Sequence, residues 1–213
     1  MRLTQIDKTT LPKALARFAS YLQPDPQSTT TAANAFGHIA RTAAAFGAPF
    51  DTSAHREAAC TLAEWFGIPT IDQAPAAAFS WDGKFLRTRS EASVLVHEIA
   101  HWQLAPADRR LLPDFGLGAG PETGRVTEAD AARRVTDSVK EREELLASLL
   151  GILWEAALGQ PAIHAFIEQN WLEAWERPAA GDQFRRTIDE LGARGLIGAD
   201  GVPCDAAVVS DPL

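Results

Sequence analysis

The segment His97-Glu98-Ile99-Ala100-His101 constrains this chain more than any other, because it spells H-E-x-x-H within a stretch predicted to be helical. One turn of α-helix takes about 3.6 residues, so two histidines four positions apart lie on one face. A divalent metal requires this spacing from two imidazoles, and the glutamate between them can reach a metal-bound water. The chain has five histidines, and two of them occupy these positions. The pattern therefore predicts a metal site, against the alternative of two ordinary helical histidines beside a surface glutamate.

The residues before this helix predict a β-hairpin. Residues 79–87 contain Asp82-Gly83, the pair that favours a type I′ turn, between short runs suited to strands. The edge of the hairpin could hold an extended substrate by main-chain hydrogen bonds, or the hairpin could simply cover the helix. The helix is predicted to begin near Ser90, whose hydroxyl can cap it, and to end at Pro106.

A third protein ligand is expected from a later helix. Residues 129–158 form a long helical pattern without proline, and Glu141, Glu143 and Glu144 stand just before its densest apolar run. A carboxylate from this helix could complete a His-His-Glu set, and three protein ligands with open positions are typical of catalytic sites. At least two of the three acids must instead have the ordinary fate of a glutamate, which is a solvated helix face.

Two classes of enzyme use such a ligand set. In a zinc hydrolase the metal lowers the pKa of its bound water to about 7, and Glu98 would take the proton as general base. In a ferrous oxygenase two histidines and a carboxylate leave positions open for dioxygen and substrate, and Glu98 would orient a metal-bound water. Imidazole suits both metals, so the ligands leave Fe²⁺ and Zn²⁺ open. The motif taken alone favours a metallopeptidase.

Polar residues after the motif are candidates for a supporting role. Asp114 could accept a hydrogen bond from a ligand histidine and so fix its tautomer, or could be a turn residue before Gly116. Arg109 and Arg110 could clamp a carboxylate or an acidic partner, or could pair with surface acids. The glycine-rich residues 118–124 could form a mobile lid over the site or a flexible connector.

The overall charge limits the partners that the chain can have. A net charge of −8 disfavours nucleic-acid binding as the main function. An acidic protein substrate would need a local basic patch, for which the candidates are Arg87, Arg89, Arg109 and Arg110. Cys60 and Cys204 are predicted to be free thiols in a reducing compartment, with one disulfide as the alternative. No apolar run has the length of a secretory or membrane segment, which predicts a cytoplasmic protein without membrane association.

The rest of the chain is predicted to be mainly helical. Helices are expected over residues 11–22, 32–46, 54–66, 161–175 and 182–194, with an irregular tail or short strand pair over 198–213. His38, His55 and His164 fall on these helices and are predicted to be surface or satisfied positions, not ligands.

No internal repeat or linker divides the chain. We therefore expect a single metal-binding domain over residues 1–213. Within it we expect an N-terminal helical region (1–50), a metal-site core (77–161) and C-terminal helices with a tail (162–213).

The order of motifs after the first histidine is also informative. Residues 97–102 read H-E-x-x-H-W, and they are followed by Arg109-Arg110 and then by Asp-Phe-Gly at 114–116. This order resembles the elongation factor P hydroxylase family. The glutamates at 141 and 144, three apart, and the Gly-x-Pro at 159–161 are similar to later features of that family. The resemblance covers roughly residues 84–161 and is strongest over 97–116.

The resemblance implies a metal-dependent, monooxygenase-like enzyme that acts on a modified lysine of a translation factor. It also implies that His97, His101 and a glutamate of the later helix hold the metal. The chain departs from the family pattern in a longer segment between Gly116 and Glu141 and in Leu117, which stands where an aromatic residue is expected.

Taken together, these features predict a mostly helical α+β fold, zincin-like, with a small sheet or hairpin beside the metal-binding helix. We expect His97, His101 and Glu144 as metal ligands, because Glu144 is the acid nearest the apolar run, with Glu141 in reserve one turn earlier. Glu98 is expected to act as acid/base or to orient water.

The leading functional prediction is an iron-dependent hydroxylase of a lysine-derived side chain in a protein, with elongation factor P as the expected substrate. One alternative is a cytoplasmic zinc metallopeptidase with Glu98 as general base. Another is a non-enzymatic interaction module stabilised by a metal.

Overall fold

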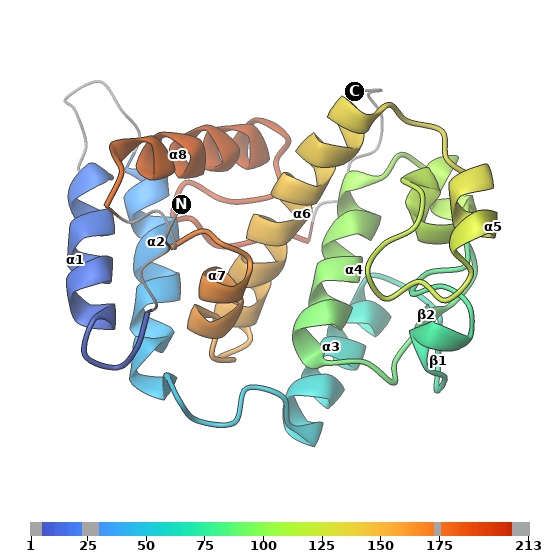
Figure 1. Ribbon diagram of the computed structural model, residues 1–213, viewed down its shortest axis with the longest axis horizontal. Helices are drawn as coiled ribbons and strands as arrows, with labels where there is room; N and C mark the ends of the chain where they lie inside the picture. The colour runs from blue at the N-terminus through green and yellow to red at the C-terminus, as the bar shows by residue number, and fades with distance from the viewer. Residues whose placement is uncertain (1–5, 23–29, 173–175, 206–213) are drawn as a thin grey trace. The chain divides into compact units, whose positions relative to one another are not determined.

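The computed structural model describes residues 6–22, 30–172 and 176–205 (Figure 1). The fold is mostly helical α+β with a small two-stranded sheet, as predicted. The chain divides into two compact units, Met1–Phe50 with Ile152–Cys204, and Asp51–Gly151 with Asp205–Leu213. The single metal-binding domain stays a prediction. No helix in the described ranges is long and apolar enough to cross a membrane.

The unit of residues 51–151 is built on a pair of helices. Helix α3 (Ser53–Trp65) packs against α4 (Ala92–Leu104), which carries the H-E-x-x-H motif. The predicted cap at Ser90 is wrong: α4 follows Glu91 without a side-chain cap, and the Ala92 amide donates to Asp51 Oδ1 at 3.2 Å. The helix ends at Leu104, two residues before Pro106, which was predicted to stop it.

The small sheet lies next to α4 in the chain. Strands β1 (Thr70–Ile71) and β2 (Leu86–Arg87) pair in parallel, and Leu86 also forms an antiparallel bridge with Trp81. The predicted hairpin is thus present as one antiparallel bridge, the sheet itself is formed with residues 70–71, and the turn is not type I′. In Asp82-Gly83 only the glycine has a positive φ, of 86°, and the Asp82 carboxylate accepts the amides of residues 84 and 85 at 2.9 and 2.8 Å.

The long helix predicted over 129–158 is interrupted. Helix α5 covers Val126–Ala131 and α6 covers Asp137–Ala157. Between them the Arg134 amide donates to the Gly116 carbonyl at 2.8 Å, which takes the backbone off the helical path. The Thr136 hydroxyl then accepts the Val139 amide at 3.4 Å, as a helix-capping threonine does. Short 3₁₀ turns complete this unit: η2 (Pro75–Ala77), η3 (Arg109–Leu111) and η4 (Pro113–Gly116).

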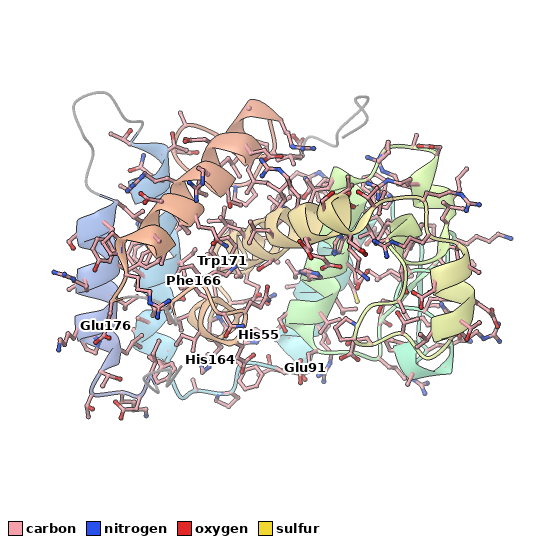
Figure 2. The ribbon with its side chains drawn as sticks, turned by 45° about the horizontal axis from the view of Figure 1, so that its top comes forward. His55, Glu91, His164, Phe166, Trp171 and Glu176 are labelled. Carbon is pink, nitrogen blue, oxygen red and sulfur yellow. The ribbon has the colours of Figure 1, made fainter. Side chains whose placement is uncertain are left out.

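The other unit is helical and has an aromatic core. It contains α1 (Leu11–Tyr21), α2 (Thr31–Arg41) with η1 (Thr42–Ala45), α7 (Ile163–Glu168) and α8 (Pro178–Ala193). Helix α8 packs against both α1 and α2 (Figure 1). Phe166 and Trp171, labelled in Figure 2, stack with ring centroids 6.4 Å apart, and the rings of this core are Phe18, Phe36, Phe166, Trp171 and Phe184.

Two predicted C-terminal elements differ from the structure. The helix expected over 161–175 ends at Glu168, because Asn170 with φ 64° turns the chain, and Trp175 lies outside the described residues. Of the tail over 198–213, an isolated bridge joins Ile197 and Pro203, and residues 206–213 lie outside the described part.

Candidate metal centre

Helices α4 and α6 bring the predicted ligands together. His97 and His101 lie one turn apart on α4, and Glu144 lies near the start of α6. Gly151, seven residues after Glu144 and so on the same face of α6, lies against α4: a Cβ there would be 3.2 Å from His97 Cα. The missing side chain allows the backbones to approach closely at this point. The close approach of the two helices places Glu144 beside the two histidines.

The three side chains converge on one point. His97 Nε2 and His101 Nε2 are 3.0 Å apart, and Glu144 Oε2 lies 3.4 Å from the former and 3.3 Å from the latter. A metal with ligands at about 2.0–2.1 Å in tetrahedral directions separates those ligands by about 3.3 Å. The triangle thus has the size that a zinc or ferrous ion requires. Among the described residues this is the one cluster of three metal-ligating groups.

One side of the cluster is open. The side chain of Glu144 is 38 % exposed and that of His97 is 23 % exposed, whereas His101 is buried. Solvent therefore reaches the cluster on the side of Glu144 and His97. An open position is what distinguishes a catalytic from a structural zinc site.

The charges within the cluster are coupled. Burial opposes the charged form of His101, but the carboxylates of Glu143 and Glu144 outweigh it and raise the pKa of His101 to about 10. Burial also opposes ionisation of Glu144, yet its contacts with His101 and His97 hold the pKa of this carboxyl well below its usual range. Burial lowers the pKa of His97, and the charge on His101 adds to this effect. Without a cation, a proton on His101 thus balances the negative carboxylates.

Glu98 lies beside this cluster in a different environment. Burial raises the pKa of Glu98 to about 8, the charge on His101 opposes the rise, and Asp114 and Glu144 add to it. A hydrogen bond with Ser80 stabilises the ionised form. Glu98 can therefore hold or release a proton near neutral pH, which suits the acid/base role predicted for it.

A second carboxylate approaches His101 from behind. Glu143 Oε1 lies 3.7 Å from His101 Nδ1, and Glu143 Oε2 accepts a hydrogen bond from Arg109 Nη2. Arg109 Nη1 donates to the Phe115 carbonyl at 3.1 Å, and the Phe115 ring stacks on His101 with centroids 5.7 Å apart. The sequence predicts Glu143 only as a possible ligand. Its one sequence signal was its position beside Glu144, about 100° away on the helix.

The Asp-Phe-Gly segment is strained where it approaches the site. Asp114 and Phe115 have φ values of 43° and 53°, a region that residues other than glycine rarely adopt. Asp114 lies in the η4 turn before Gly116, which is the second role that the sequence left open, and its carboxylate does not bond a histidine of the cluster. Its Oδ2 accepts the Thr123 hydroxyl, and burial raises the pKa of this carboxyl. It acts on the site through its charge, on Glu98.

Each arginine of the predicted basic patch makes a contact within the protein. Arg87 is buried and pairs with Asp82 at 3.0 Å, while Arg89 pairs with Asp72 at 2.8 Å. Arg109 pairs with Glu143, and Arg110 lies 4.0 Å from the centre of the Trp102 ring and donates to the Trp102 carbonyl. The side chain of Arg89 remains exposed, so a basic patch there stays a prediction.

The carbonyls on one side of the hairpin make hydrogen bonds within the protein. The carbonyls of residues 78, 79, 80 and 81 accept hydrogen bonds from Arg125 N, Arg87 Nη1, Arg87 N and Asp114 N. These bonds engage the carbonyls on this side of the hairpin, and whether its edge holds a substrate stays a prediction. The glycine-rich residues 118–124 also make contacts with the rest of the unit. The Ala119 amide donates to Asp130, and Gly124 packs so closely on Ala76 that a Cβ would lie 2.0 Å from the Ala76 carbonyl oxygen.

Glu141 and the other three histidines are not grouped with the cluster. Glu141 is exposed on α6 and is not one of the grouped ligands. His38 Nε2 contacts the Asp200 carbonyl at 3.0 Å, and His164 stacks on Phe46 with centroids 5.3 Å apart. His55 lies at the start of α3, where its amide donates to Thr52. The cluster therefore takes two of the five histidines, as predicted.

Compared with known proteins, the chain matches no family model, no curated protein and no solved structure. The zincin-like fold and the hydroxylase family stay predictions from the motifs.

Proposed function

We propose that the chain is a mononuclear metalloenzyme in which His97, His101 and Glu144 hold a divalent metal and Glu98 handles a proton beside it. The proposal is carried by the triangle of ligand atoms, whose sides of 3.0, 3.3 and 3.4 Å match a metal with three protein ligands. The partly exposed Glu144 leaves room for a substrate on the same side.

We further propose that the reaction is hydroxylation of a lysine-derived side chain in a protein, with elongation factor P as the first substrate to test. The support is the resemblance of residues 97–116 to the elongation factor P hydroxylase family. The balanced reaction inserts one atom of dioxygen into a C–H bond and reduces the other to water with two electrons from an external donor. A bound ferrous ion would supply the activation of dioxygen, and a bound zinc ion would supply a polarised water.

The residues of the chain have separate tasks in this proposal. His97, His101 and Glu144 hold the metal at one side and leave the exposed side to the substrate. Glu98, with its pKa raised to about 8 by burial, takes or gives a proton at its carboxyl group. Trp81 and Phe115, stacked with centroids 5.7 Å apart, form a rigid apolar wall that continues to His101.

A zinc metallopeptidase is the second candidate, favoured by the position of Glu98 beside the histidine cluster. The occupied carbonyls of residues 78–81 weigh against it, because a peptidase that binds an extended substrate by strand addition needs a free edge. A cytoplasmic location is part of the proposal, in keeping with the reduced thiol of Cys60.

The test separates these candidates by metal and product. Protein purified without oxygen is analysed for iron and zinc, and is then incubated with lysyl-modified elongation factor P, ferrous iron, dioxygen and a reductant. A gain of one oxygen mass in wild type, lost in Glu98→Gln, supports the hydroxylase. No gain with iron bound removes this substrate, and peptide cleavage by the zinc form supports the peptidase. A His101→Ala variant that loses metal yet keeps every biological activity leaves only the interaction module.

A further inference from the structure

His101 has a polar partner on each of its two ring nitrogens. Its Nε2 faces His97 and Glu144, and its Nδ1 faces Glu143 Oε1 at 3.7 Å. Both His101 Nδ1 and Glu143 Oε1 are buried and have no hydrogen-bond partner. Two buried polar atoms left unpaired are costly, and these two face each other about half an ångström beyond the longest ordinary N–H···O hydrogen bond.

We propose that Glu143 is the positioning residue of His101: it accepts a hydrogen bond from His101 Nδ1–H and so directs the Nε2 lone pair to the metal. The proposal rests on the metal centre proposed above. A neutral imidazole has one donor and one acceptor nitrogen, so fixing the proton on Nδ1 makes Nε2 the ligand atom. A carboxylate in this position also makes the imidazole a stronger ligand.

Arg109 keeps Glu143 in this role. The Glu143 side chain is fully buried, and a carboxylate there needs a charged partner to remain ionised. Arg109 supplies this partner at Oε2, which leaves Oε1 for His101. Through its other nitrogen Arg109 also holds the Phe115 carbonyl, and the ring of Phe115 lies on His101. The Arg109 guanidinium therefore holds both Glu143, which faces His101 Nδ1, and Phe115, whose ring stacks on His101.

The same contacts separate the tasks of two adjacent glutamates. Glu144 is on the Nε2 side of His101 and is partly exposed, so it is free to bind the metal. Glu143 is on the Nδ1 side, buried and paired, so it cannot reach the metal without breaking the contact with Arg109. His97 Nδ1 has no hydrogen-bond partner in the described part of the chain, so this support is specific to His101.

The direct test is the tautomer of His101 in the zinc-loaded wild-type protein, read from long-range ¹H–¹⁵N NMR spectra of the histidine rings. We expect His101 to carry its proton on Nδ1, with a slowly exchanging, downfield proton. This measurement needs no variant. Zinc bound to His101 through Nδ1 would overturn the proposal.

Variants give the second readout, by competition titration with zinc. Glu143→Gln is expected to lower zinc affinity by about 10- to 100-fold and to shift the His101 ring signals. Arg109→Lys, which keeps a positive charge, is expected to lower it less, and Glu141→Gln, on the exposed face of the same helix, is the matched control. A Glu143→Gln protein that binds zinc like Glu141→Gln, with unchanged ring signals, overturns this inference alone. A wild-type protein that binds neither zinc nor ferrous iron overturns the proposed function with it.

Discussion

The carboxylate of Glu144 lies within 3.4 Å of both ligand nitrogens, and no other acid among the described residues is grouped with them. Glu141 and Glu143 lie within three positions of Glu144 in the sequence, but Glu141 is exposed and Glu143 is buried against Arg109. This difference at single residues is the basis for proposing Glu144 as the metal ligand.

Replacing Glu144 tests that assignment. Glu144→Gln keeps the size of the side chain but removes the charge, so the zinc affinity should fall by more than about 100-fold. This is more than the loss of a residue that only hydrogen-bonds to a metal ligand would cause. Glu141→Gln should leave it unchanged, because that side chain is exposed. Competition with a chromogenic chelator measures both. Equal affinities in the two variants would remove Glu144 from the ligand set.

Metal binding should also release a proton. The pKa of His101 is raised to about 10 by Glu143 and Glu144 against the opposing effect of burial, so in the metal-free protein the ring is protonated at pH 7. A metal must displace this proton, so apparent affinity should rise about tenfold per pH unit below pH 9. Calorimetry in buffers of different ionisation enthalpy counts the protons. A binding enthalpy that does not depend on the buffer would contradict this prediction.

The H-E-x-x-H spacing was sufficient to predict the two histidines, because helical geometry alone brings positions four apart together. The choice of Glu144 rested on its closeness to the apolar run, and the structure groups this residue with the histidines. The role of Glu143 could not be predicted, because it depends on Arg109, which is distant in sequence and reaches the helix only in the folded unit.

At the scale of elements, the approach of α6 to α4 depends on Gly151. A Cβ at this position would lie 3.2 Å from His97 Cα, which is tighter than most Cβ contacts in proteins. The site therefore depends on a residue that contributes no side chain to it.

Gly151→Ala should move the two helices apart. We expect the free energy of unfolding to fall by about 1–2 kcal/mol, as overpacking outweighs the better helix propensity of alanine. Zinc affinity should fall with it, because His97 is displaced from Glu144. The matched control is Gly37→Ala in α2, where nothing lies within 4 Å and a gain of up to about 1 kcal/mol is expected. Denaturant unfolding with and without zinc measures both, and an equal gain in the two variants would contradict the close approach.

Hydrophobic periodicity predicted most helices to within a few residues, but it failed where another segment takes over the backbone hydrogen bonds. The break between α5 and α6 is an example, since the Arg134 amide bonds to Gly116 rather than within a helix. Thr136 is the kind of residue that starts a helix, and it caps α6 in the structure. The segment was nevertheless predicted as one helix, because it contains no proline. The turn at Asp82-Gly83 differed because the Asp82 side chain bonds the turn amides itself.

At the scale of the whole molecule, one buried acid outside the metal site affects stability. Glu155 on α6 is 5 % exposed, and burial, with the charge of Glu168 in addition, raises its pKa to about 8. Because the folded pKa lies above the ordinary value of 4.5, its contribution to stability is complete below pH 4.5 and is lost as the pH rises through 8.

Glu155→Gln should remove this pH dependence. Each unit of pKa difference corresponds to about 1.4 kcal/mol, so between pH 5 and pH 9 wild type should lose roughly 1–3 kcal/mol more unfolding free energy than the variant. Glu168→Gln removes only the neighbouring charge and should retain most of the dependence. Denaturant unfolding across this pH range gives the three curves. Parallel curves for wild type and Glu155→Gln would show that the acid is ionised in the folded protein.

The mostly helical fold class followed from composition and periodicity, whereas the division into two compact units was not predicted, because α6 contributes residues to both without a linker in the sequence.

The chemistry of the molecule depends on whether its cluster binds a metal. A crystal structure of the zinc-loaded protein, with anomalous scattering at the zinc edge, decides this. We predict one peak at about 2.0–2.2 Å from His97 Nε2, His101 Nε2 and a Glu144 carboxylate oxygen. A map with no peak at these atoms, or with zinc held elsewhere, would contradict the metal centre and the enzyme proposed on it.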